Sequence, residues 1–216
     1  MIKNLNTNNI KFYKKLKNFM MLRKSRIFYK DKKVLKIIEE VKKYGDKALI
    51  KYEKKFNSNT KIKISNENIK KAIKELDHKV KKSIDLAYNR IFKFHKNQKY
   101  KDFKVKDTLK NKLEYKFFPI EKVGIYVPGG SASYPSTVLM NAIPAVLAKV
   151  KKIVMVSPFL KGKLNSGVIY AANKCKIKNI YSIGGVQAIA ALAYGTKSIE
   201  SVNKIVGPGN KFVSAA

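Results

Sequence analysis

The chain has 216 residues, 45% of them hydrophobic, and a formal net charge of +34. No apolar run reaches the roughly 18 residues that a membrane-spanning helix needs, and the single cysteine, Cys175, excludes an internal disulfide framework and a cysteine-based metal site. Because the first thirty residues also lack the apolar core of a secretory signal, we expect a cytoplasmic protein with no membrane partner.

The large excess of basic residues is the feature that could point to nucleic acid. However, 45 of the 48 basic residues are lysine, whereas arginine makes the bidentate contacts to phosphate and guanine that nucleic-acid sites favour. The charge is also spread along the chain, at +24 over residues 1–122 and +10 over residues 123–216. Many Asn and Ile residues accompany the lysines, as in an A/T-rich coding sequence. We therefore do not expect a nucleic-acid partner, although nucleic-acid binding stays open as an alternative.

The first elements that the sequence predicts are helices. Residues 1–30 show no clear apolar period and predict a basic, poorly ordered segment. Apolar residues then recur at helical spacing in four stretches, at residues 34–41, 48–56, 69–76 and 80–94. Gly45 predicts the end of the first helix, Asp46 the N-cap of the second, and Ser65 the N-cap of the third. Residues 31–112 are therefore expected to be mostly helical.

The pattern changes to strands from Leu113. Residues 113–120 alternate like a strand, and four short β-branched runs suited to buried strands follow: "KVGIYV" (122–127), "KIVMVS" (152–157), "NIYSIG" (179–184) and "NKIVGP" (203–208). Apolar stretches long enough for a covering helix separate these runs, and the runs begin 30, 27 and 24 residues apart, as in βαβ units. The sequence thus predicts an α/β fold, with a mostly helical N-terminal region followed by a Rossmann-like parallel sheet over residues 113–216.

Glycines follow three of the four predicted strands, as Gly129-Gly130, Gly184-Gly185 and Gly207-Pro208-Gly209. Ligands of such sheets bind outside the carboxyl ends of the strands, where glycine permits close approach and the next helix offers free N–H groups to an anion such as a pyrophosphate. Tight turns explain each pair taken singly, and no G-x-G-x-x-G fingerprint is present. Taken together, the three favour a dinucleotide crevice, with polar side chains at the same edge from Tyr126, Ser131, Ser133, Ser136, Thr137, Gln187 and Asn210.

The sequence offers few catalytic groups. Both histidines, His78 and His95, lie in the helical N-terminal part, and no His, Cys or Asp cluster has metal-ligand spacing. Residues 123–216 contain one acidic residue, Glu200, which precedes its strand rather than following it. We therefore expect no catalytic residue and no metal ligand in this chain, and a crevice that binds without reacting.

Three long motifs resemble the histidinol dehydrogenase family: "GIYVPGGSASYPSTVLMNAIPA" (124–145), "IGGVQAIAALAYGT" (183–196) and "KIVGPGNKFVSAA" (204–216). Weaker similarity runs through "IIEEVKKYGDKALIKYEKKF" (37–56) and "AYNRIFKFHKNQ" (87–98). The resemblance covers nearly the whole chain after about residue 32.

The resemblance implies oxidation of L-histidinol to L-histidine through L-histidinal with NAD, by a zinc-bearing homodimer. By position it implies that Tyr126, Gln187 and Asn210 contact the NAD. The departures from the family pattern, Val186 and Lys211-Phe212, do not alter these three residues.

The family's members are considerably longer, and the resemblance places their zinc ligands, substrate contacts and Glu-His base after the Gly-Pro-Gly-Asn motif. It therefore implies an N-terminal portion that is inactive alone, with residues 31–112 belonging to a domain completed by later sequence. Two alternatives stay open beside it. One is a non-catalytic remnant that binds dinucleotide, and the other is a basic nucleic-acid-binding protein.

Overall fold

A four-stranded parallel sheet lies at the centre of the computed structural model, which describes residue 7 and residues 11–24, 31–129, 134–159 and 165–216. Its strands, in spatial order, are β5 (Asn179–Tyr181), β4 (Lys152–Val156), β3 (Lys122–Tyr126) and β6 (Lys204–Val206). The predicted Rossmann-like α/β fold is confirmed. Because β4 and β5 extend the sheet on one side of β3 and β6 on the other, the strand order reverses beside β3. Such a reversal is where doubly wound sheets open a ligand crevice.

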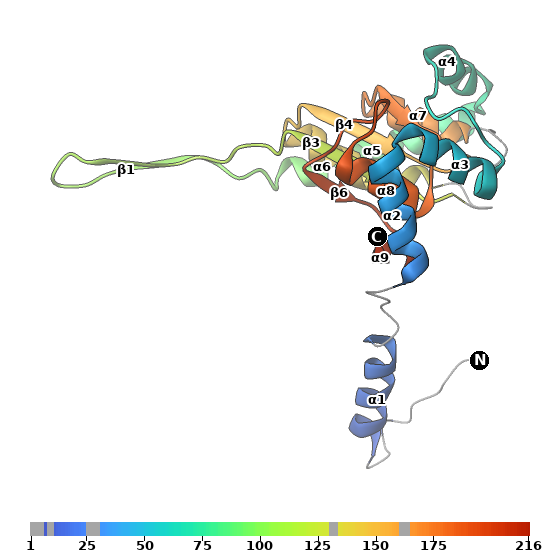
Figure 1. Cartoon of the computed structure of the whole chain (residues 1–216). Helices are drawn as coiled ribbons and strands as arrows, with labels where there is room; N and C mark the ends of the chain where they lie inside the picture. Colours follow the sequence, from blue (N-terminus) through green and yellow to red (C-terminus); the bar gives the residue numbers. More distant parts are fainter. Residues whose placement is uncertain (1–6, 8–10, 25–30, 130–133, 160–164) are drawn as a thin grey trace.

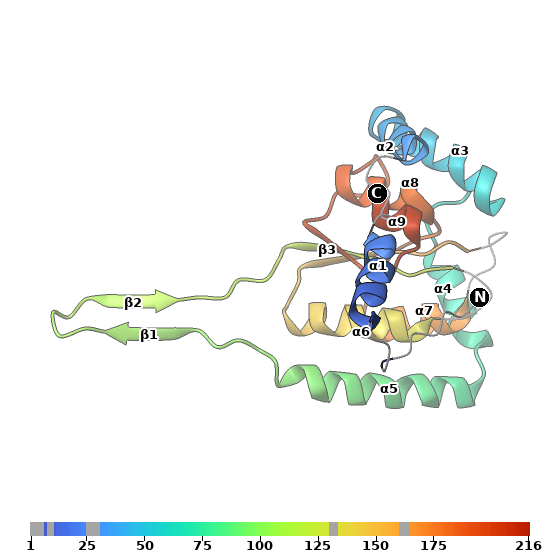
Figure 2. The ribbon, with the colours of Figure 1, turned by 90° about the horizontal axis from the view of Figure 1, so that it is seen from below.

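Helices cover both faces of the sheet (Figure 2). One face carries α6 (Pro135–Leu147) and α7 (Ser166–Lys174), with α4 (Asn66–Glu75) and α5 (His78–Lys96) packed on them. The other carries α8 (Gly185–Tyr194), on which α2 (Lys32–Tyr44), α3 (Asp46–Asn57) and the short α9 (Lys211–Ala215) pack. The core consists of two apolar clusters, one on each face of the sheet. Each cluster contains residues from before and from after position 113.

The four predicted N-terminal helices are present as α2 to α5, and their ends show which capping predictions are right. Gly45 ends α2 with a positive φ of 53° that favours glycine. Ser65 caps α4 by accepting from the N–H of Asn68 at 3.2 Å. Asp46 is not an N-cap, because Gly45 takes that position and the Asp46 carboxylate instead accepts from the Ser198 hydroxyl at 2.7 Å.

Two elements have no counterpart in the sequence predictions. Helix α1 (Phe12–Lys24) lies within the segment predicted to be poorly ordered. Strand β1 (Phe103–Lys106) pairs antiparallel with β2 (Lys112–Tyr115), so the strand predicted over residues 113–120 forms only in part. This hairpin projects from the body of the molecule (Figure 1), and all residues of both strands are exposed. None of the helices in the described part is long and apolar enough to cross a membrane.

Candidate dinucleotide site

A cavity of about 620 Å³ opens at the carboxyl ends of the strands, beside the reversal in strand order. The structure brings Tyr126, Gln187 and Asn210 together in its lining. Ser136 and Thr137 begin α6 and are not among the residues that line it, while Ser131 and Ser133 lie outside the described residues. The remaining lining combines loop residues with one apolar wall, from Lys33, Val34, Ile37, Phe56, Asn57, Pro128, Gly129, Pro158, Gly184, Gly185, Val186 and Phe212.

The loops that follow β3, β4 and β5 meet at Pro158. A Cβ built on Gly129 would lie 2.5 Å from Pro158 Cγ, and one built on Gly184 would lie 2.4 Å from Pro158 Cβ. Both distances are far below van der Waals contact, so no larger residue fits at either position while the loops keep these places. The lack of a side chain at both glycines therefore lets the three loops approach one another closely around the cavity.

Tyr126 ends β3 and is only 5% exposed. Its hydroxyl oxygen accepts a hydrogen bond from the backbone N–H of Gly185 at 3.2 Å. Burial raises the pKa of Tyr126, so its phenol is neutral at physiological pH and keeps its own proton for donation. The side chain thus links the end of β3 to the start of α8.

Gln187 lies in the first turn of α8 and is 2% exposed. Its Nε2 donates to Oε1 of Glu53 at 2.8 Å, and the backbone N–H of Gly184 donates to the same oxygen at 2.9 Å. The other carboxylate oxygen of Glu53 accepts from Nδ2 of Asn57 at 2.6 Å. Burial raises the pKa of Glu53, an effect that outweighs the opposing influence of these three donors.

Sequence reasoning missed Glu53, which is fully buried on α3. A signal existed, because Glu53 stands four residues after the buried Leu49 and hence on the apolar face of the helix. The finding also corrects the expectation of free N–H groups at this helix start. At the start of α8 the N–H groups of Gly184 and Gly185 already donate to Glu53 and Tyr126.

Asn210 follows β6 and is the N-cap of α9. Its Oδ1 accepts from the N–H groups of Phe212 at 3.0 Å and Val213 at 3.1 Å. The cap uses the oxygen of this amide, so Nδ2 is the side-chain group that can donate a hydrogen bond to a ligand.

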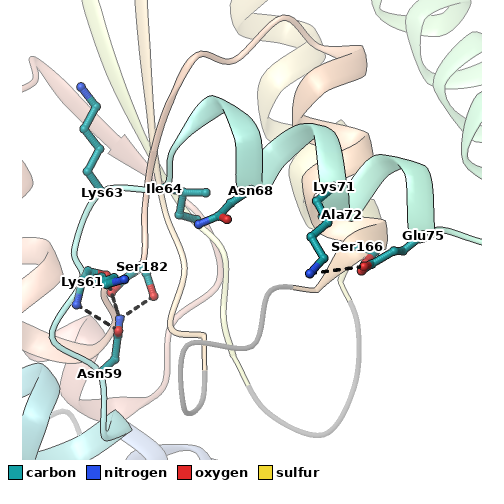
Figure 3. Close-up of a pocket in the computed structure, with 10 residues that line it drawn as sticks. All are labelled: Asn59, Lys61, Lys63, Ile64, Asn68, Lys71, Ala72, Glu75, Ser166 and Ser182. Carbon is teal, nitrogen blue, oxygen red and sulfur yellow. Dashed lines mark hydrogen bonds and ion pairs between the residues drawn. The ribbon is translucent and has the colours of Figure 1, made fainter.

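A second, smaller cavity of about 330 Å³ lies beside α4 and the end of β5 (Figure 3). Several of its polar side chains have partners within the protein. Asn59 Nδ2 donates to the hydroxyl and carbonyl oxygens of Ser182 at 2.8 and 3.2 Å, and Lys71 lies 3.9 Å from the carboxylate of Glu75. The cavity thus marks a joint between segments, and Tyr126, Gln187 and Asn210 do not line it.

The remaining candidate groups lie away from the main cavity. His95 bonds to Gln98 through Nδ1 at 2.6 Å near the base of the hairpin, and His78 is the exposed first residue of α5. Cys175 is buried at the end of α7, where burial raises the pKa of its thiol to about 12. Within the described ranges, no three His, Cys, Asp or Glu side chains come together as they would around a metal ion.

Comparison with known proteins gives one consistent result. The histidinol dehydrogenase family model matches residues 23–216. A histidinol dehydrogenase of Pelagibacter ubique is 59% identical over all 216 residues, which cover 50% of that protein, and one of Acinetobacter baylyi is 46% identical over 86% of this chain and 44% of its own. The crystal structure of the enzyme from Elizabethkingia anophelis superposes with a TM-score of 0.81 at 42% identity, covering 85% of this chain and 44% of that one. The chain spans about half the length of the curated relatives it matches.

Proposed function

This chain belongs to the histidinol dehydrogenase family, and we propose on that basis that it is the N-terminal, NAD-binding part of an enzyme that oxidises L-histidinol to L-histidine through L-histidinal. One observation carries the proposal. Tyr126 at the end of β3, Gln187 in the helix that follows β5 and Asn210 in the loop that follows β6 line one cavity beside the reversal in strand order. That is the place where doubly wound sheets bind dinucleotides.

The residues of the cavity fit such a ligand. Val34, Ile37 and Phe56 give an apolar wall against which a planar ring can pack. Lys33 is the one cation among the described lining residues and suits the negative charge of a pyrophosphate. NAD supplies the hydride acceptor of a dehydrogenase when it is bound. The residues of this chain would bind and orient it.

Catalysis by this chain alone is not part of the proposal. Removing a proton from an alcohol needs a base within hydrogen-bond reach, and the carboxylate beside the cavity, Glu53, is buried and occupied by three donors. The described residues also give no donor set that fits zinc. We therefore propose that the base, the zinc ligands and the histidinol contacts of the working enzyme come from sequence beyond this chain.

We propose that the intact enzyme is a cytoplasmic homodimer. The exposed apolar side chains of the hairpin, among them Phe103, Leu113 and Tyr115, would be covered in a larger assembly.

Calorimetric titration of the purified chain with NAD⁺ tests the proposal. We expect binding by the wild type, loss of affinity in Gln187→Ala and Asn210→Ser, and no oxidation of L-histidinol by any of them. Serine keeps the N-cap of α9 but removes the amide nitrogen, so the second variant separates ligand contact from helix capping. Asn173→Ala, a change at an exposed asparagine of α7, is the matched control. A wild-type chain that binds no NAD⁺, or binding unchanged in both site variants, would refute the proposal.

A further inference from the structure

Glu53 is a fully buried carboxylate on α3, whose other buried residues are Ala48, Leu49 and Tyr52. Removing a carboxylate from water is costly unless its hydrogen bonds are satisfied. One of the three donors around it comes from α3 itself and two come from the start of α8. The carboxylate therefore connects α3 to the loop at the cavity.

A carboxylate fixes the direction of the amide that it holds, because an ionised carboxylate only accepts hydrogen bonds. Gln187 must therefore turn its Nε2 toward Glu53, and its Oε1 points away. Every fully buried side-chain nitrogen and oxygen in the described residues has a hydrogen-bond partner, whereas no described residue donates to this Oε1. The oxygen lies beside Gly185, 3.1 Å from the place that a Cβ on this glycine would take, and both residues line the cavity.

We propose that Glu53 is a positioning residue that locks Gln187 as a hydrogen-bond acceptor at the cavity, so that the ligand must present a donor there. This inference rests on the proposed function. The donors on a nicotinamide dinucleotide are the ribose hydroxyls, the carboxamide N–H and the amino group of the adenine. The phosphates do not qualify, because they only accept.

Two variants of Glu53 test the lock. Glu53→Gln keeps an oxygen that accepts from both Gly184 and Gln187, and Asn57 can turn its own amide to match. Glu53→Leu has a similar size and no acceptor, which frees the Gln187 amide to rotate. We expect Glu53→Gln to hold its affinity for NAD⁺ within about threefold, and Glu53→Leu to lose about tenfold, equal to about 1.4 kcal/mol.

A double-mutant cycle separates positioning from a purely structural effect. If Glu53 acts through Gln187, Glu53→Leu lowers the affinity in the wild type but adds nothing in a Gln187→Ala background. An equal loss in both backgrounds would overturn the inference. Nicotinic acid adenine dinucleotide, in which a carboxylate replaces the carboxamide, identifies the donor. A preference for NAD⁺ that disappears in Gln187→Ala assigns the carboxamide, and a preference that is unchanged in Gln187→Ala assigns the donor to a ribose hydroxyl or the adenine amino group.

A ligand-free measurement keeps the two proposals apart. In the unliganded ¹⁵N-labelled protein, the Gln187 side-chain amide should give resolved, slowly exchanging protons, retained in Glu53→Gln and lost in Glu53→Leu. If the wild type binds no NAD⁺, the proposed function fails while this spectrum still decides whether Glu53 orients Gln187. Unchanged Gln187 amide signals in Glu53→Leu would overturn the positioning role.

Discussion

Gly184→Ala should destabilise the protein through one steric contact at the cavity. Gly184 has φ −141° and ψ −175°, an extended backbone that alanine adopts freely, so no conformational penalty enters. The added Cβ would lie 2.4 Å from Cβ and 2.6 Å from Cγ of Pro158, well inside the optimal separation of about 3.5–4.0 Å between carbon atoms. Pro158 is a rigid ring between Ser157 and Phe159, which are both buried, so it cannot turn aside.

Overpacking of this kind costs about 1–3 kcal/mol in the free energy of unfolding. For a chain of this size, each kcal/mol lowers Tm by about 2–4 °C. The shift would also move the N–H of Gly184 from Glu53, so we expect the affinity for NAD⁺ to fall by about tenfold, equal to about 1.4 kcal/mol.

Urea denaturation and calorimetric titration of the same preparations measure both effects. Pro158→Gly removes the opposing Cβ and Cγ, so its combination with Gly184→Ala should be less destabilised than the sum of the two single variants. A Gly184→Ala protein within about 0.5 kcal/mol of the wild type, with full affinity, would show that the three loops do not meet at Pro158 as described.

Three further predictions concern buried groups. Because burial raises the pKa of Glu53, the folded state holds its proton more tightly than the unfolded state, and wild-type stability should fall as pH rises from the ordinary carboxyl range through the raised pKa. Glu53→Gln should lack this loss, so a difference in unfolding free energy from wild type that stays constant with pH would contradict the reasoning. Asn59→Ala leaves the hydroxyl and carbonyl of Ser182 without their donor and should cost about 1–3 kcal/mol in urea denaturation, against a change within about 0.5 kcal/mol for Asn173→Ala. Cys175, buried and with its thiol pKa raised to about 12, should react with a thiol reagent only at the rate of unfolding, and fast labelling of the native protein would refute its burial.

The parallel sheet and the edge at which the candidate site lies could be predicted because both follow from local pattern. A buried parallel strand must be a short apolar run, and the carboxyl ends of such strands must meet at one edge. Tyr126, Gln187 and Asn210 were therefore expected to lie near one another, and they line the same cavity. Their contact with NAD stays a prediction.

The contacts that were missed depend on long-range pairing. Glu53 stands among charged residues in "KYEKKF" and binds Gly184, 131 residues later, so its partner is invisible locally. Strand β1 pairs with β2 and buries none of its residues, so no apolar pattern was needed to form it. Asp46 has the residue type of an N-cap, but the Ser198 hydroxyl competes for its carboxylate.

The position of β3 between β4 and β6 determines the order in which the strands can pair during synthesis. β3 meets β4 early, but its other neighbour comes much later, as shown by the hydrogen bond between Lys122 and Asn203, which are 81 residues apart. Until β6 has left the ribosome, one edge of an apolar strand stays open to pairing with other chains. The apolar faces of α2 and α3 likewise stay uncovered until α8 has been made. A nascent chain of this protein therefore needs protection from aggregation until α8 and β6 have both been made.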